Sequence, residues 1–286
     1  EKTSLIKNLG ENVTPREKRK YFANLIKDQE VVLAPGVFDM VSAKLAERES
    51  HSALYMSGYA TVASYLGLPD AGLASYTDMV DRARSIASAV NVPLIADADT
   101  GFGGLLNIQH TVRGFEDAGV AAIQIEDQEF PKKCGHTVGR RVTAVGDMVE
   151  KIKVAVDSRK DTNFLIIART DARTSLGLDE AIGRVLAYRR AGADILFVES
   201  PETESEFEKI ASSVDAPLLA NMVEGGRSPV LPKSRLEQLG YAIAIYPGTG
   251  FFAAAAALKG VYRHLENTGS SLGTNKTLYP IEEMHE

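Results

Sequence analysis

The chain has 286 residues, 44% of them hydrophobic and 24% charged, which is ordinary globular composition and enough length for one large buried core. The formal net charge is -6, and the lysines and arginines are scattered rather than gathered in a stripe, which argues against a nucleic-acid-binding protein. The chain has a single cysteine, its first thirty residues are charged, and no apolar run approaches the length of about 18 residues that a membrane span needs. These features predict a cytoplasmic protein that binds neither nucleic acid nor membrane.

Short apolar runs of strand length recur along the chain. Residues 14–27, ahead of the first run, have the pattern of an N-terminal helix. The segments between later runs have helical spacing and good helix formers, as in 78–90, 179–191 and 204–213. From residue 251 onward the sequence predicts C-terminal helices with a polar, acidic end. The runs themselves cover residues 31–35, 53–57, 93–96, 121–125, 164–168, 195–198, 217–220 and 242–246.

These runs are continuously apolar rather than alternating, which indicates strands buried on both faces, as in a parallel sheet. Eight strand-helix units predict an α/β fold of the (β/α)8 TIM-barrel type. The alternative, an open doubly wound sheet, usually carries a Gly-x-Gly-x-x-Gly motif after the first strand, and residues 34–39 do not match it. We therefore expect one domain over residues 1–286, with the barrel at about 30–250 and C-terminal helices at about 251–286.

Polar or charged residues stand at the end of most predicted strands. In a barrel of this type the catalytic groups come from the carboxyl ends of the strands and from the loops that follow them. We therefore expect these side chains to meet at one mouth: Ser57, Gly58 and Tyr59, Asp97 and Asp99, Glu126 and Asp127, Arg169 to Asp171, Glu199, and Asn221 with Glu224.

Asp97 and Asp99 lie two residues apart at the end of the third strand. Two neighbouring carboxylates repel each other unless a proton or a cation neutralises them. Mg2+ suits such a pair because it prefers oxygen ligands and usually takes only one or two carboxylates, so Glu126 and Asp39 would act through water. No histidine is among the candidates, which argues against zinc. The alternative is that the two aspartates cap the next helix or pair with arginine.

Arg169 is predicted at the end of a buried strand. An arginine there needs a carboxylate or an anionic ligand, because an unpaired buried charge is very costly. Ligand contact and an internal ion pair with Glu199 or Glu126 are both compatible with the sequence, and both can hold at once.

The only cysteine, Cys134, lies in the loop after the fourth strand, close to Lys132, Lys133 and His136. Neighbouring cations lower the pKa of a thiol and favour the thiolate. A lone cysteine is usually a packed core residue, but this polar, glycine-containing loop favours a role in proton transfer or nucleophilic attack.

Several motifs in this order resemble the isocitrate lyase and phosphoenolpyruvate mutase superfamily over about residues 30 to 250. The most specific is KKCGH at 132–136. The others are Ser57-Gly58, DADTGFGG at 97–104, IEDQ at 125–128, ARTDA at 168–172 and NMVEGG at 221–226.

The resemblance implies an (α/β)8 barrel, commonly a homotetramer with exchanged C-terminal helices, that acts on α-keto or 2-hydroxy acids through an enolate. For this chain we expect a small dicarboxylate substrate. Asp97 and Asp99 would hold Mg2+, which Mn2+ could replace, with Asp39 and Glu126 in its water shell. Cys134 would be the proton donor on a closing loop, and Arg169 would grip the substrate oxygens. The other substrate-binding residues would be Ser57, Gly58, Tyr59, Gly135, His136, Glu199 and Asn221.

The resemblance also implies a Mg-dependent carbon-carbon lyase rather than a phosphonate enzyme, since the mutases generally lack the Cys-Gly-His loop. Members that cleave 2-methylisocitrate carry a basic residue shortly after the eighth strand, where this chain has Phe252. A 2-alkylmalate such as 2,3-dimethylmalate, cleaved to pyruvate and propionate by retro-aldol chemistry, is therefore favoured. The alternatives are 2-methylisocitrate lyase, oxaloacetate hydrolase or decarboxylase, a phosphonopyruvate-type enzyme, and a non-enzymatic scaffold barrel.

Overall fold

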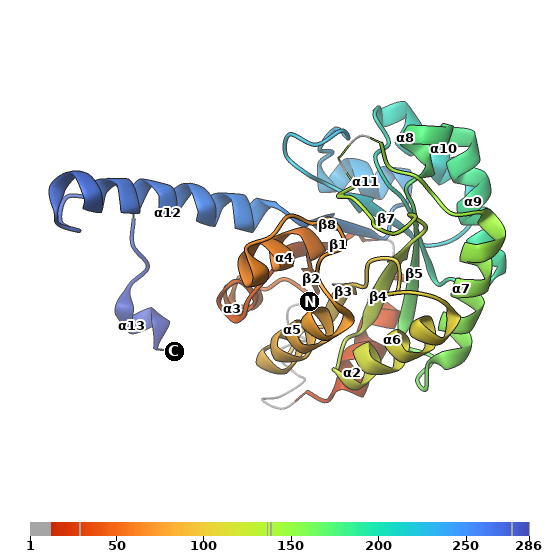
Figure 1. The fold of residues 1–286 in the computed structure, drawn as a ribbon, viewed down its shortest axis with the longest axis horizontal. Coiled ribbons are helices and arrows are strands. Elements are labelled where there is room, and N and C mark those ends of the chain that lie inside the picture. The colour runs from red at the N-terminus through yellow and green to blue at the C-terminus, as the bar shows by residue number, and fades with distance from the viewer. Residues whose placement is uncertain (1–12, 29, 136, 138, 276, 286) are drawn as a thin grey trace.

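The computed structural model describes residues 13–28, 30–135, 137, 139–275 and 277–285. Eight parallel strands close into a barrel in sequence order, and β8 pairs with β1 (Figure 1). This confirms the predicted barrel, and each predicted run coincides with a strand to within two residues. The strands are β1 (Val32–Val37), β2 (Leu54–Met56), β3 (Leu94–Asp97), β4 (Ala122–Glu126), β5 (Leu165–Thr170), β6 (Ile195–Val198), β7 (Leu218–Asn221) and β8 (Ile243–Tyr246).

Most of the helices surround the barrel, and several begin after a residue whose side chain caps them, namely Thr14, Asp39, Ser57, Ser75 and Thr203. The predicted N-terminal helix is present and starts after Thr14, whose side chain forms a capping box with Glu17. The helices are α2 (Pro15–Leu25), α3 (Met40–Arg48), α4 (Gly58–Leu66), α5 (Tyr76–Ala89), α6 (Leu105–Asp117), α7 (Val145–Ser158), α8 (Ala172–Leu176), α9 (Leu178–Arg190), α10 (Glu204–Ser213), α11 (Lys233–Leu239), α12 (Thr249–Thr268) and α13 (Ile281–Met284).

The core has two parts. One lies between the barrel and the surrounding helices. The other fills the barrel with inward-facing side chains such as Ile95 and Ile167, and it also contains Phe22 and Leu25 of α2. Helix α2 therefore closes the amino-terminal end of the barrel. The carboxyl-terminal end, where the polar residues lie, is left for a functional site.

Helix α12 follows β8 and extends away from the barrel (Figure 1). None of its 20 residues is buried, even though some of them are apolar. Leu258, Tyr262 and Leu265 are among the exposed apolar side chains. Among the described helices, none combines the length and apolar character that crossing a membrane requires.

Candidate active site

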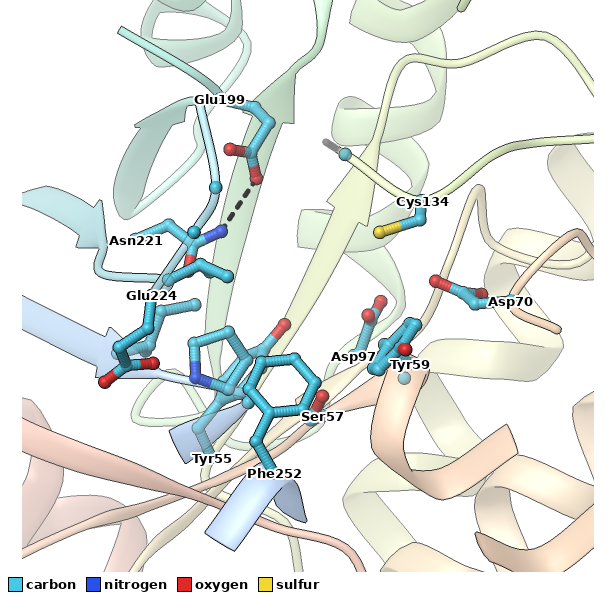
Figure 2. A pocket seen from close by; sticks show the side chains of 18 of the residues that line it. Tyr55, Ser57, Tyr59, Asp70, Asp97, Cys134, Glu199, Asn221, Glu224 and Phe252 are labelled. Carbon is cyan, nitrogen blue, oxygen red and sulfur yellow. Dashed lines mark hydrogen bonds between the residues drawn. The ribbon is translucent and has the colours of Figure 1, made fainter. Parts of the chain in front are cut away.

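A cavity of about 250 Å³ lies at the carboxyl-terminal end of the strands (Figure 2). It brings together most of the residues that the sequence placed at strand ends. Its polar lining comes from the ends of five strands, from the loop that carries Cys134 and from the connection between α4 and α5: Ser57, Gly58, Tyr59, Asp70, Asp97, Cys134, Gly135, Arg169, Glu199, Asn221 and Glu224.

The first wall of the cavity is the amino-terminal end of α4. Ser57 is the N-cap residue, and its hydroxyl accepts a hydrogen bond from Ala60 N (3.3 Å). The backbone amides of a first helical turn have no partner within the helix and carry its positive dipole end. Gly58 packs on Asp97, since a β-carbon at residue 58 would lie 2.4 Å from Asp97 Oδ2. This wall can therefore receive an anion beside the Asp97 carboxylate.

Asp97 and Asp99 lie together, buried, at the end of β3, as the sequence predicted. Asp99 N donates to Asp97 Oδ1 at 3.0 Å, and Asp99 has a φ of 48°. Burial raises the pKa of Asp97, and it raises the pKa of Asp99 to about 6, although Lys132 opposes both shifts. Asp97 lines the cavity, whereas Asp99 points toward Lys132.

Lys132 and Asp70 add a feature that the sequence did not reveal. The Lys132 ammonium is buried, 2.5 Å from Asp70 Oδ1 and 2.7 Å from Asp99 Oδ1. The sequence predicts Lys132 as one of the cations around Cys134, but its ammonium lies against these two carboxylates. Asp70 lies between α4 and α5 and not at a strand end. The only signal for it is an acidic residue in the turn-forming stretch LPDAG at 68–72.

Arg169 lies at the centre of an anionic cluster. Its guanidinium donates to both carboxylate oxygens of Asp171 at 2.9 Å, and it lies 3.3 Å from Glu126 Oε2 and 3.4 Å from Glu199 Oε2. Burial lowers the pKa of Arg169, but these carboxylates outweigh burial and raise it well above its usual value. The expected internal pairs with Glu126 and Glu199 are confirmed, and the shortest contact is with a residue not expected as a partner, Asp171.

The Cys134 loop is fixed at its base and at its tip. At the base, Gln128 pairs with Val142 in an antiparallel bridge, and its side chain both donates to Lys133 O (2.8 Å) and accepts from Lys133 N (2.9 Å). At the tip, Gly135 packs on Arg169, and its carbonyl accepts from Ser200 Oγ (3.1 Å). The thiol of Cys134 consequently faces the cavity (Figure 2). His136 lies outside the described residues.

The opposite wall contains Asn221, Glu224 and Phe252 (Figure 2). Asn221 Nδ2 donates to Glu199 Oε2 at 3.0 Å, whereas its buried Oδ1 has no hydrogen-bond partner among the described residues. Glu224 accepts from Thr249 Oγ1 (2.7 Å). The Phe252 ring lies 6.1 Å from the Tyr59 ring. This wall offers an amide oxygen, a carboxylate and aromatic surface, and its described residues include no lysine, arginine or histidine.

The oxygen-rich side of the site fits a hard divalent ion. Glu126 Oε1 is buried without a hydrogen-bond partner among the described residues, and Asp97 and Asp99 lie close by. Within the same residues no three acidic, histidine or cysteine side chains converge closely enough to hold a metal by themselves. Mg2+ needs only one or two carboxylates besides water and substrate, so the donor set suits it. Asp39 does not join the group around the cavity, because its carboxylate caps α3 by accepting from Ser42 N (2.7 Å).

Known proteins are similar to this chain over most of its length. A family model described as phosphoenolpyruvate phosphomutase matches residues 22–266. The 2,3-dimethylmalate lyase of Eubacterium barkeri is 49% identical over 92% of this chain and 91% of its own length. The 2-methylisocitrate lyase of Aeropyrum pernix is 44% identical over 92% and 84%.

Solved structures agree with these matches. Oxaloacetate acetylhydrolase bound to 3,3-difluorooxalacetate has a TM-score of 0.91 at 34% identity, covering 96% of this chain and 94% of that one. A 2,3-dimethylmalate lyase has a TM-score of 0.89 at 33% identity, covering 96% and 91%. Phosphonopyruvate hydrolase with oxalate and Mg2+ has a TM-score of 0.84 at 30% identity, covering 93% of each chain. The chain belongs to the phosphoenolpyruvate mutase/isocitrate lyase superfamily.

Proposed function

We propose that this protein is a Mg-dependent carbon-carbon lyase that cleaves a 2-alkylmalate such as 2,3-dimethylmalate into pyruvate and propionate. Two lines of support converge on this reaction. A 49% identical relative is a 2,3-dimethylmalate lyase. The cavity also combines anion-binding groups on one wall with aromatic surface on the other.

The pyruvate half of the substrate would lie against the start of α4. The backbone amides of Gly58 and Tyr59 and the hydroxyl of Ser57 provide donors for a carboxylate at a helix N-terminus. Arg169 would grip the substrate oxygens, since its guanidinium lines the cavity while Asp171 holds it in place. Glu199 and Asn221 would complete the pocket around the second half of the substrate.

Cleavage breaks the C2–C3 bond of the substrate. The Glu199 carboxylate, which lines the cavity, takes the proton of the C2 hydroxyl, the oxygen becomes the ketone of pyruvate, and the bond pair moves to C3. The resulting carbanion is an enolate of the propionate carboxyl group. Cys134 gives its thiol proton to C3, which releases propionate and leaves a thiolate. The loop that carries Cys134 would also exclude water from the carbanion.

Asp97 and Asp99 would hold the metal, with Glu126 and Asp70 near enough to contact its water shell. A bound Mg2+ would supply Lewis-acid stabilisation of the oxygen that changes charge during cleavage. A Mg2+ complex is known for the related phosphonopyruvate hydrolase.

The observation that carries the choice of substrate is the wall around Phe252, whose described lining residues include no cation to pair with a third carboxylate. One unpaired buried carboxylate would be costly. The test is a panel of 2,3-dimethylmalate, 2-ethylmalate, 2-methylisocitrate, oxaloacetate and phosphonopyruvate with Mg2+. It is followed by release of the 2-oxoacid product, which is 2-oxobutanoate from 2-ethylmalate and pyruvate from the other substrates, or by oxaloacetate loss. We expect the 2-alkylmalates to be turned over best. A clear preference for 2-methylisocitrate would overturn this choice, and activity that survives chelation would overturn the metal.

We further propose that the protein is a homotetramer in which α12 packs on a neighbouring subunit. The support is a 20-residue helix with no buried residue and several exposed apolar side chains. Light scattering on the full chain at micromolar concentration should give four times the mass of the chain. A monomeric mass would contradict the proposal.

A further inference from the structure

Asp127 is a buried carboxylate that the proposed reaction does not use. The sequence places it at the mouth of the barrel beside Glu126, but it is not among the described residues that line the cavity. Its side chain lies between the end of β5 and helix α9, where it accepts hydrogen bonds from four described donors. A buried charge is stable only while its partners are in place. The partners therefore show what Asp127 holds and what holds Asp127.

Asp127 contacts three successive residues at the end of β5. Its backbone amide donates to Arg169 O at 3.1 Å. Its carboxylate accepts from Thr170 Oγ1 at 2.6 Å and from Asp171 N at 2.9 Å. Asp171 in turn accepts two hydrogen bonds from the guanidinium of Arg169, which lines the cavity. Asp127 therefore fixes both the backbone that carries Arg169 and the carboxylate that orients its guanidinium.

Helix α9 supplies the other two donors. The Tyr188 hydroxyl donates to Asp127 Oδ2 at 2.7 Å, and Arg184 Nη1 lies 3.2 Å from the same oxygen. Burial and the Asp127 charge raise the pKa of Tyr188, so its hydroxyl stays protonated and remains a donor. Burial also raises the pKa of Asp127, and the hydrogen bond from Tyr188 opposes that shift. The Tyr188 hydroxyl thus stabilises the charged carboxylate, the form that accepts on both oxygens.

We propose that Asp127 and Tyr188 are positioning residues for Arg169. Tyr188 holds the Asp127 carboxylate, Asp127 holds residues 169–171, and Asp171 holds the guanidinium in the cavity. Because neither Asp127 nor Tyr188 lines the cavity, both act on how firmly the substrate is bound and not on bond cleavage. The effect on binding rests on the proposed function, in which Arg169 grips the substrate oxygens, whereas the hold on residues 169–171 does not.

The matched variants are Tyr188→Phe and Tyr241→Phe. Each removes one buried hydroxyl and leaves an aromatic ring of the same shape. Tyr188 donates to Asp127, whereas Tyr241 donates to the backbone of α10, at Phe207 O (3.3 Å). Loss of either hydrogen bond should lower the midpoint of urea unfolding. Only Y188F should change the end of β5.

Hydrogen exchange in the metal-free protein tests the hold on the end of β5. The Asp171 amide donates to Asp127 Oδ1, and the Ala172 amide donates to Thr170 Oγ1 at 3.2 Å. Exchange of these amides reports how often their hydrogen bonds open. In Y188F both should exchange at least about tenfold faster than in wild type, equivalent to ~1.4 kcal/mol of opening free energy. Exchange of β1 is the reference for general destabilisation, and Y241F should leave both amides near wild type.

Calorimetry of oxalate binding with saturating Mg2+ tests the consequence for the cavity. Oxalate and Mg2+ are bound together by the related phosphonopyruvate hydrolase. Y188F should bind oxalate about tenfold more weakly than wild type. Its affinity for Mg2+ alone should be unchanged, because the network does not include Asp97 or Asp99. With the 2-alkylmalate that the wild type prefers, KM should rise while kcat changes less than about threefold, as expected when uniform binding is lost.

A double-mutant cycle shows whether Tyr188 acts through Asp127. In Asp127→Asn the charge that the hydroxyl stabilises is absent, so adding Tyr188→Phe should weaken oxalate binding much less than it does in the wild type. Equal effects in the two backgrounds would overturn the proposal. So would Y188F that is less stable than wild type but has wild-type exchange at Asp171 and wild-type oxalate affinity, since its hydroxyl would then have only a structural role.

The measurements separate this proposal from the proposed function. If the wild type does not bind oxalate, the substrate grip assigned to Arg169 is wrong, and exchange at residues 171 and 172 still decides the role of Asp127 and Tyr188. If Y188F does not fold, Thr170→Val takes its place, because it removes the other hydroxyl that donates to Asp127 Oδ2. Wild-type exchange at Asp171 together with wild-type oxalate affinity in T170V would then overturn the role of Asp127.

Discussion

Gly135 lies directly on Arg169, with no room for a side chain between them. A β-carbon at residue 135 would lie 2.4 Å from Arg169 Nη2 and 2.9 Å from Glu199 Oε2. The loop can therefore bring Cys134 to the cavity only because residue 135 has no side chain.

Gly135→Ala should consequently lift the loop from the site. Misplacement of a reacting group by about 1 Å can cost ~10²-fold in rate, so we expect a fall of that order in kcat for lyase turnover. The free energy of unfolding should change little. Gly146→Ala is the control, because it lies in α7 with no atom within 4 Å of the added carbon. Unchanged kcat in G135A would show that the observed approach is not used in catalysis.

Cys134→Ser tests the proton donor. A positioned general acid contributes typically about 10² to 10⁴ in rate, and a serine hydroxyl is a much weaker acid than a thiol, so kcat should fall within that range. Oxalate affinity, measured by calorimetry with Mg2+, should remain near wild type because Arg169 and the start of α4 are untouched. Full turnover by C134S would assign the proton to another group.

The barrel could be predicted because its strands are buried on both faces and so read as continuous apolar runs. The polar strand ends were equally visible, since Asp97, Arg169 and Glu199 interrupt those runs. The role of Asp70 and the ion-pair partners of Lys132 could not be predicted, because this pairing depends on how two loops pack against each other. Asp39 stands at a strand end like the others, but its side chain is taken up by capping α3.

Asp171 should make stability depend on pH. Burial opposes its ionisation, but Arg169 and Arg140 outweigh burial and hold the pKa of Asp171 below its usual value. A carboxyl group whose pKa is lower in the folded than in the unfolded protein stabilises the fold at pH values above its unfolded pKa, which is about 3.9 for Asp. This stabilisation is lost as the pH falls through the pKa of the folded state. Asp171→Asn should lower the free energy of unfolding at pH 7 by about 3–5 kcal/mol, because it leaves a buried charge without its partner.

Urea unfolding of wild type and D171N at several pH values measures this effect. The difference in the free energy of unfolding between the two proteins should be constant from about pH 5 to pH 7. It should narrow below about pH 4, where Asp171 of the unfolded chain begins to take up its proton. A difference that stays the same down to pH 3 would contradict the assigned direction of the pKa shift.

Phe252 should control which substrates fit, since its ring lines the cavity at the start of α12, on a wall whose described lining residues include no cation. Phe252→Arg places a guanidinium on this wall. It should raise kcat/KM for 2-methylisocitrate relative to 2,3-dimethylmalate by at least about tenfold, which requires only ~1.4 kcal/mol of selective transition-state binding. Phe252→Gln, which is polar and uncharged, separates the effect of charge from that of lost aromatic surface. If both variants change the ratio equally, the cavity selects by size and not by the missing charge, and the preference for an alkyl group would need another cause.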